Sequence, residues 1–119
     1  MAGVIVQYIV VRKDLIEKLS WPLGAVIAQA CHACSAVLHQ HQDDAGCKQY
    51  LEKIDSMHKV VLEIPNEEKL HQLSSTLLSN NIDHKLWIEQ PENIATCLAT
   101  KPDQKETIQK YFKNLKLFK

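Results

Sequence analysis

Two runs of β-branched residues, separated by a long alanine-rich segment, limit this chain to a sheet covered by helices. The first run, Val4–Val11 (VIVQYIVV), has the composition of a buried strand. The second, Lys59–Ile64 (KVVLEI), ends at Pro65. Between them, residues 24–42 follow a helical pattern whose small side chains let a helix approach a sheet closely. A strand, a helix and a second strand are therefore the first elements that the sequence predicts.

The remaining segments extend this alternation to the order βααβαββα. Strands are also predicted at residues 83–89 and 94–100, and helices at about 47–54, 67–79 and 103–114. Ser20 and Asn66 are the expected N-caps of the helices that follow them. Alternating strands and helices that end in a hairpin-like pair are typical of a mixed sheet. We therefore expect one α/β domain over residues 1–119, with a four-stranded mixed sheet flanked by helices.

The charge balance gives no general indication of a nucleic-acid partner. Lys and Arg together number 14, as do Asp and Glu, so only a local basic surface could bind RNA. The C-terminal segment offers one, with Lys101, Lys105, Lys110, Lys113, Lys116 and Lys119. Such a run is either a solvated helix face or a surface that attracts a phosphate backbone.

Cysteines and histidines raise metal chemistry, which their positions do not favour. Cys31 and Cys34 have the spacing of a redox or zinc pair but lie inside an apolar helical run. We expect them to be reduced packing residues. His39 and His41 are two apart on the same helix and point in different directions. The sequence therefore predicts neither a metal site nor a cofactor.

Several classes of function lack support in the sequence. There is no glycine-rich phosphate loop and no G-x-S-x-G motif, so nucleotide-driven chemistry and serine-based hydrolysis are not indicated. No apolar stretch reaches the length of a membrane span, and no secretory signal is evident. We therefore expect a cytoplasmic protein that does not bind membranes.

One face of the alanine-rich helix carries the first candidate site. Ala25, Gln29, His32 and Ala36 share that face. An imidazole can transfer a proton near neutral pH, and a carboxamide can orient a water or a carbonyl group. The alternative is a hydrogen-bonded structural histidine. Arg12-Lys13-Asp14 follows the first strand, where α/β proteins commonly bind ligands, and is either a phosphate site or a local ion pair.

Several segments together resemble the type 2 peptidyl-tRNA hydrolases. They are QYIVVRKDL at residues 7–15, GAVIAQACHA at 24–33, KVVLEIP at 59–65 and the ending NLKLFK. The resemblance covers nearly the whole chain. It implies a four-stranded mixed sheet with flanking helices, a tRNA or peptidyl-tRNA partner, and homodimers.

The resemblance also implies roles for individual residues. The motif positions filled as in the family are Arg12, Asp14, Gly24, Gln29 and His32. Water would attack the ester between peptide and tRNA, His32 or Glu89 would steer or deprotonate it, and Gln29 would hold the carbonyl region. Substrate or RNA contacts would come from Arg12, Lys13, Asp14, Gly24 and Thr96.

Three positions depart from the family pattern. A lysine is replaced by Ala25, an aspartate by Glu89, and a loop that carries a threonine is shortened, so that Thr96 matches a later family threonine. These departures keep a second hypothesis open, in which the same fold serves as a catalytically weak or inactive binding or adaptor module.

Overall fold

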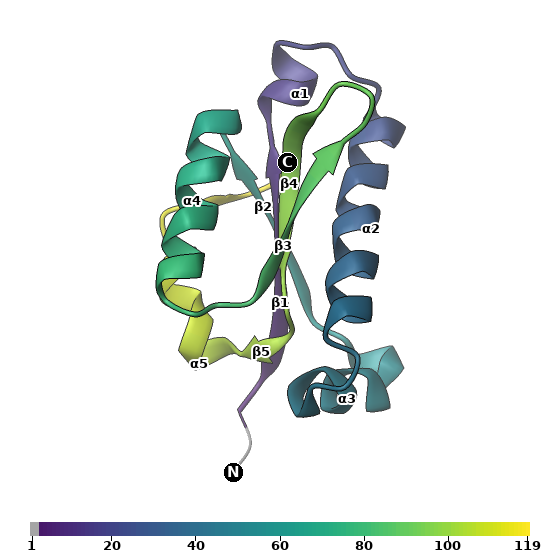
Figure 1. The fold of residues 1–119 in the computed structure, drawn as a ribbon, viewed down its shortest axis with the longest axis vertical. Coiled ribbons are helices and arrows are strands. Elements are labelled where there is room, and N and C mark those ends of the chain that lie inside the picture. The colour runs from purple at the N-terminus through teal and green to yellow at the C-terminus, as the bar shows by residue number, and fades with distance from the viewer. Residues whose placement is uncertain (1–2) are drawn as a thin grey trace.

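The computed structural model describes residues 3–119, which form a six-stranded mixed sheet (Figure 1). The strands are β1 (Ile5–Arg12), β2 (Lys59–Ile64), β3 (His84–Glu89), β4 (Ile94–Thr100), β5 (Asp103–Gln104) and β6 (Lys116–Leu117). Their order is β3-β4-β1-β2-β6, with β5 beside the start of β1. β1 runs parallel to β2 and antiparallel to β4, which makes the sheet mixed as predicted.

Helices cover both faces of the sheet (Figure 1). They are α1 (Asp14–Glu17), α2 (Leu23–Gln40), α3 (Ala45–Glu52), α4 (Glu67–Ser79) and α5 (Lys105–Ile108), with 3-10 turns at Ile54–Ser56 and Gln109–Tyr111. α2 packs on one face over a core that includes Ile9 and Val11, and α4 and α5 pack on the other over Tyr8 and Val10. Successive side chains of β1 therefore point to opposite faces of the sheet and belong to two separate cores. Within the described part of the chain, no helix has the length and apolar character needed to cross a membrane.

The prediction of four strands is wrong, because two short strands extend the sheet. The expected last helix over 103–114 is replaced by β5, α5 and a 3-10 turn. β6 lies in the tail and pairs with β2 through Leu117 and Lys116. Two-residue strands carry no periodic signal, since their pairing is decided by the neighbouring strand. The four longer strands lie where the sequence places them.

The expected helix caps were right in one case and wrong in the other. Asn66 accepts a hydrogen bond from the Lys69 backbone N–H at 2.9 Å and caps α4. Ser20 has a positive φ of 56° and lies outside α2, whose N-cap is Pro22 with no side-chain cap. Orphan N–H groups in the first turn of α2 therefore remain available to other acceptors.

The carboxyl ends of three strands meet at one edge of the sheet. β1 and β2 are parallel, and β3 shares their direction because each of β1 and β3 is antiparallel to β4. Figure 1 shows that α2 begins at this same edge, beside the turn between β3 and β4. This arrangement places the first turn of α2 next to Glu89, the last residue of β3.

Candidate active site

A hollow of about 270 Å³ opens between the start of α2 and the turn that joins β3 to β4. It is lined by Trp21, Pro22, Ala25, Gln29, Glu89 and Glu92. The structure therefore brings together two predicted site residues, Gln29 and Glu89, that lie 60 positions apart in the sequence. Ala25, the position where the family pattern has lysine, faces the same hollow.

Each carboxylate oxygen of Glu89 is held by its own donor. The indole N–H of Trp87 donates to Oε1 at 3.1 Å, and the Gln29 amide donates to Oε2 at 3.2 Å. The Trp87 bond first, and the Gln29 bond second, lower the pKa of Glu89 below its usual value because both stabilise the charged form. Glu89 is therefore an ionised and oriented carboxylate at neutral pH.

Gln29 links this carboxylate to the protein core. Its side chain is buried, its Nε2 also donates to the Ala25 carbonyl at 3.2 Å, and its Oε1 accepts from the Thr96 hydroxyl at 3.0 Å. The Cys97 thiol donates to the Gln29 backbone carbonyl at 3.2 Å, and burial raises the pKa of this thiol to about 12. Both ends of the carboxamide are thus engaged, which fixes its orientation toward Glu89.

Thr96 reaches Gln29 because of an irregularity in strand β4. Trp87 pairs with Cys97 and Ile88 pairs with Ala95, so Thr96 is left as an extra residue in the ladder. A bulge of this kind re-aims side chains, and here it turns both Thr96 and Cys97 toward α2. Thr96 is fully buried and contacts Gln29 instead of facing the hollow.

His32 lies one helical turn beyond Gln29 and does not line the hollow. Its side chain is exposed, and its ring stacks on Trp87 with centroids 4.7 Å apart and planes 15° apart. The sequence analysis missed Trp87, although strand alternation places it on the same face as Glu89. The role of His32 in proton transfer stays a prediction.

Arg12 and Asp14 form an ion pair that braces the start of β4. Arg12 is 5 % exposed, and its Nε and Nη2 donate to Asp14 at 3.0 and 2.9 Å. Its Nη1 donates to the Ala95 carbonyl at 2.9 Å, while the Ala95 N–H donates to Glu67 at 2.8 Å. The local ion pair is therefore present, and it holds the backbone next to Thr96. A phosphate contact by Arg12 stays a prediction.

Lys13 and Gly24, two further predicted site residues, do not line the hollow. The Lys13 ammonium lies 3.6 Å from Glu63 and 4.5 Å from the centre of the Phe118 ring, and it donates to the Lys119 carbonyl. Gly24 is exposed in the first turn of α2, and a Cβ there would meet no atom within 4 Å. Close packing therefore does not require glycine at this position.

The cysteines are all free. Cys47 and Cys97 are buried and Cys34 is half-buried, but Cys31 is exposed. The interpretation of Cys31 as a packing residue is therefore wrong, because its side of α2 faces solvent. Among residues 3–119, no three His, Cys, Asp or Glu side chains gather as a metal site would require.

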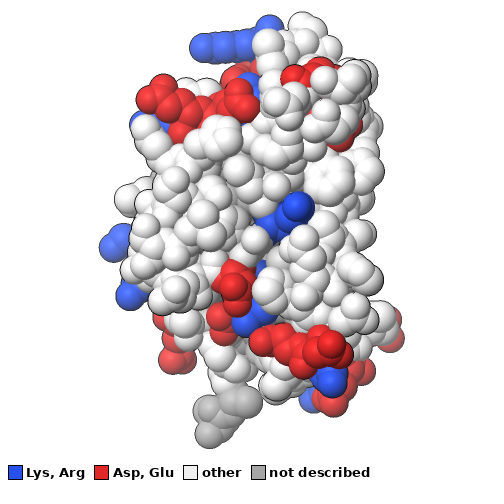
Figure 2. Space-filling view, in the orientation of Figure 1, with Lys and Arg blue, Asp and Glu red and all other residues white. Residues whose placement is uncertain are grey.

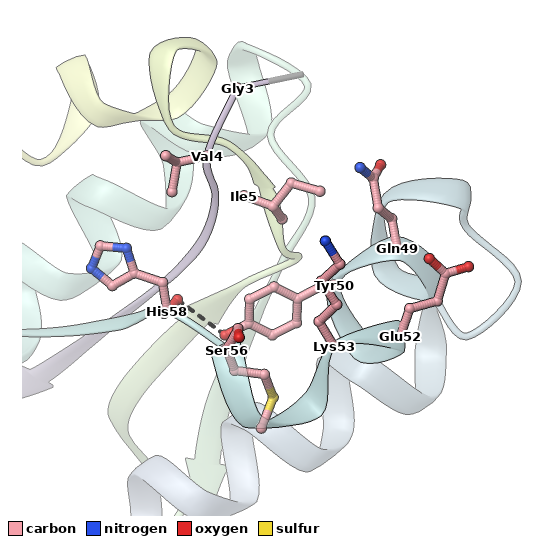
Figure 3. A pocket seen from close by; sticks show the side chains of 10 residues that line it. Gly3, Val4, Ile5, Gln49, Tyr50, Glu52, Lys53, Ser56 and His58 are labelled. Atoms are coloured by element: carbon pink, nitrogen blue, oxygen red, sulfur yellow. Dashed lines mark hydrogen bonds between the residues drawn. The ribbon is translucent and has the colours of Figure 1, made fainter. Parts of the chain in front are cut away.

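A second hollow, of about 570 Å³, lies at the opposite end of the molecule beside α3 (Figure 3). Tyr50 donates a hydrogen bond to the backbone carbonyl of His58 at 3.0 Å, and Figure 3 shows the His58 ring pointing away from Tyr50. The side chains of Tyr50 and His58 therefore do not converge in this hollow.

Charge is unevenly spread over the face seen in Figure 2. Acidic side chains gather toward both ends of this face, and a basic side chain lies near its middle. Basic residues at the sheet edge near the site include Lys13 and Lys116, which line a further hollow at the ends of β1 and β2. Lys101 instead pairs with Asp44 at 3.0 Å and Asp83 at 3.4 Å.

This edge of the α/β sheet holds an ionised carboxylate beside the start of α2, and comparison with known proteins gives the family. The profile of the family "Peptidyl-tRNA hydrolase PTH2" matches residues 5–118. The chain belongs to this family.

Two curated relatives are similar over almost the whole chain. Both are named "Putative peptidyl-tRNA hydrolase PTRHD1", one from Homo sapiens and one from Mus musculus. They are 54% and 52% identical to this chain over 117 residues, which cover 98% of the chain and 84% of each relative. The family resemblance seen in the sequence is therefore confirmed.

Proposed function

We propose that this chain hydrolyses peptidyl-tRNA, cleaving the ester that joins the peptide to the 3′ ribose of tRNA. Family membership indicates the reaction class. One observation carries the assignment of this reaction to the hollow. The Glu89 carboxylate lines the hollow, and each of its two oxygens accepts a hydrogen bond from a separate donor. We further propose that residues 1–119 act as one domain.

In the proposed reaction, Glu89 orients the attacking water. The water oxygen bonds to the ester carbonyl carbon, its proton passes to Glu89, and the proton then moves to the 3′ oxygen as the ester C–O bond breaks. The carbonyl oxygen becomes negatively charged, and the uncapped first turn of α2 favours negative charge there. Gln29 acts as a positioning residue, because both ends of its carboxamide are already engaged.

The test is single-turnover release of peptide from a defined peptidyl-tRNA. We expect measurable cleavage that is slow beside a family member with the full motif. The lowered pKa makes Glu89 a weak base, and Ala25 supplies no positive charge. Cleavage that does not depend on Glu89 would place the reaction outside this hollow.

Binding of tRNA is expected to weaken as salt rises. Lys13 and Lys116 lie at the edge that carries the site, and contacts of such lysines with phosphates release counterions. These two contacts would give a slope of roughly −1.5 when the logarithm of the association constant is plotted against the logarithm of the salt concentration. We expect Lys116→Gln to reduce this slope by about one unit. The matched control is Lys48→Gln, which replaces an exposed lysine on α3. Equal slopes for the two variants would contradict the proposal that Lys116 contacts RNA phosphates.

We also propose a cytoplasmic homodimer, the state that the family resemblance implies. An apolar hollow of about 310 Å³ between α2 and β2 supports it, since Leu23 and Ile27 are 60% and 55% exposed there. We expect Ile27→Glu to shift the mass measured by light scattering to that of a monomer. Asn80→Glu, at the end of α4, should leave the mass unchanged. A wild-type chain that is monomeric at high concentration would exclude the dimer.

A further inference from the structure

A seam between α2 and β3 continues from the hollow along the surface. Alternate residues of β3 face the same side of the sheet, so Lys85, Trp87 and Glu89 all face α2. The strand register agrees, because Lys85 and Trp87 pair with Ala99 and Cys97, which belong to the core on the α2 side. On the helix, Gln29 lies opposite Glu89 and His32 lies opposite Trp87.

The aromatic pair in this seam is anchored by a hydrogen bond and open on one side. Trp87 is half-buried, and its N–H is tied to Glu89 at 3.1 Å. His32 lies on the indole, nearly parallel to it, yet remains exposed. One face of the imidazole is therefore covered while the side chain still offers a flat surface to solvent. A preorganised ring of this kind binds a further planar group at little entropic cost.

We propose that His32 and Trp87 form a stacking platform for a nucleobase, the 3′-terminal adenine of the tRNA whose ester is cleaved in the hollow. This inference rests on the proposed function and deepens it by naming how the RNA end is held. Proteins bind single-stranded nucleic acids by stacking bases on aromatic side chains, and histidine serves in this role.

The spacing along the seam fits one nucleoside. His32 is three residues after Gln29, a rise of about 4.5 Å along the helix. The base and the esterified oxygen of a terminal nucleoside belong to the same ribose, so they require neighbouring binding places of about this separation. An ester in the hollow therefore puts its own base beside His32.

Lys85 is placed to meet the next part of the chain. It lies two residues before Trp87 on β3, about 6.6 Å farther from the hollow. It is half-buried and forms no ion pair with another residue of the described range 3–119. An ammonium at this position can contact the phosphate on the 5′ side of the terminal nucleoside.

The direct test is binding of a labelled RNA trinucleotide that ends in CCA, measured by fluorescence anisotropy. We expect an otherwise identical trinucleotide with an abasic 3′ end to bind about 5- to 150-fold more weakly, the range given by one stacked base. His32→Ala and Trp87→Leu should weaken CCA binding to a similar extent and remove the discrimination. His39→Ala, an exposed histidine on the same helix, is the control and should bind like the wild type.

Trp87→Phe separates stacking from the hydrogen bond to Glu89. Phenylalanine keeps a ring under His32 but has no N–H, so this variant should retain the preference for a terminal adenine. It also covers the case in which Trp87→Leu fails to fold. Equal binding of the adenine-ended and abasic RNAs by the wild type, or no binding of either at low salt, would overturn the platform. So would His32→Ala with unchanged discrimination.

Hydrolysis kinetics distinguish this inference from the proposed function. On peptidyl-tRNA, loss of the platform in His32→Ala should raise KM and leave kcat close to the wild-type value. A fall in kcat with constant KM would assign His32 to proton transfer and overturn the platform, while the hydrolase would stand. Absence of cleavage by the wild type, with CCA discrimination intact, would overturn the proposed function and leave an adenine-binding site. If KM depends on an aromatic residue of the peptide and not on the terminal base, the group that stacks on His32 is a peptide side chain. That result would overturn the nucleobase platform.

Discussion

Replacing Glu89 with glutamine is expected to lower the single-turnover rate of peptidyl-tRNA cleavage about 100- to 1,000-fold. The carboxylate is the charged group that orients water in the proposed reaction, and general bases typically contribute rate factors of about 10²–10⁴. Glutamine keeps the shape of the side chain but loses its charge. Its amide nitrogen would also face one of the two donors that now hold Glu89, Trp87 or Gln29.

The control for this prediction lies in the same hollow. Glu92 lines it but forms no hydrogen bond with the described part of the chain, so Glu92→Gln should change the rate less than about twofold, as surface substitutions do. Circular dichroism would verify that both variants fold. Equal rates for wild type and Glu89→Gln would remove Glu89 from the reaction.

The pH dependence of the wild-type rate offers an independent check. The reaction needs the charged form of Glu89, and hydrogen bonds from Trp87 and Gln29 lower its pKa below the usual 4.5. A lowered pKa keeps the carboxylate ionised as pH falls, so the rate contribution of Glu89 should persist through pH 5 and be lost only in stronger acid. A loss of rate centred near pH 6 to 7 would instead point to an imidazole as the essential base.

The longer elements of this fold are predictable because their signals are local. Lys59–Ile64 and Ile94–Thr100 are β-branched or small-residue runs that end near prolines, and the structure places strands over these same residues. Asn66 caps α4 through its own side chain and the N–H three residues on. No information from distant parts of the chain is needed for such features.

The site depends on contacts that no local pattern contains. The register shift that turns Thr96 toward Gln29 arises from pairing between β3 and β4. The family resemblance implied a substrate contact for Thr96, and that role stays a prediction. Arg12 could equally have been a phosphate ligand or an ion-pair partner, and only its position beside β4 shows which contacts it makes. Trp87 was within reach of sequence reasoning, since it is two residues before Glu89 on one strand.

Introducing a lysine at position 25 is expected to raise the cleavage rate about 100- to 1,000-fold. Ala25 lies in the first turn of α2 and faces the hollow with Gln29 and Glu89. A lysine side chain from this position would bring an ammonium beside the scissile ester, where negative charge develops on the carbonyl oxygen. Loss of one donor of this kind typically costs a factor of about 10²–10³ in rate, so its gain should return a similar factor.

The stability cost of Ala25→Lys should be small beside this gain. Lysine is nearly as good a helix former as alanine. A cation in the first turn opposes the helix dipole by roughly 0.3–1 kcal/mol, and attraction to the ionised Glu89 offsets part of this. The variant should therefore fold, with a melting temperature a few degrees below that of the wild type.

Ala25→Met is the matched control, because methionine fills the hollow with a chain of similar length but no charge. We expect Ala25→Lys to be faster than wild type and Ala25→Met to be no faster, since only the charge stabilises the developing oxyanion. If both variants cleave faster than the wild type by the same factor, the gain is steric. In that case the missing charge does not limit the rate at this site. If the wild type already cleaves as fast as a family member with the full motif, the uncapped start of α2 and the Glu89 carboxylate suffice without a lysine, and Ala25 then leaves the reaction intact.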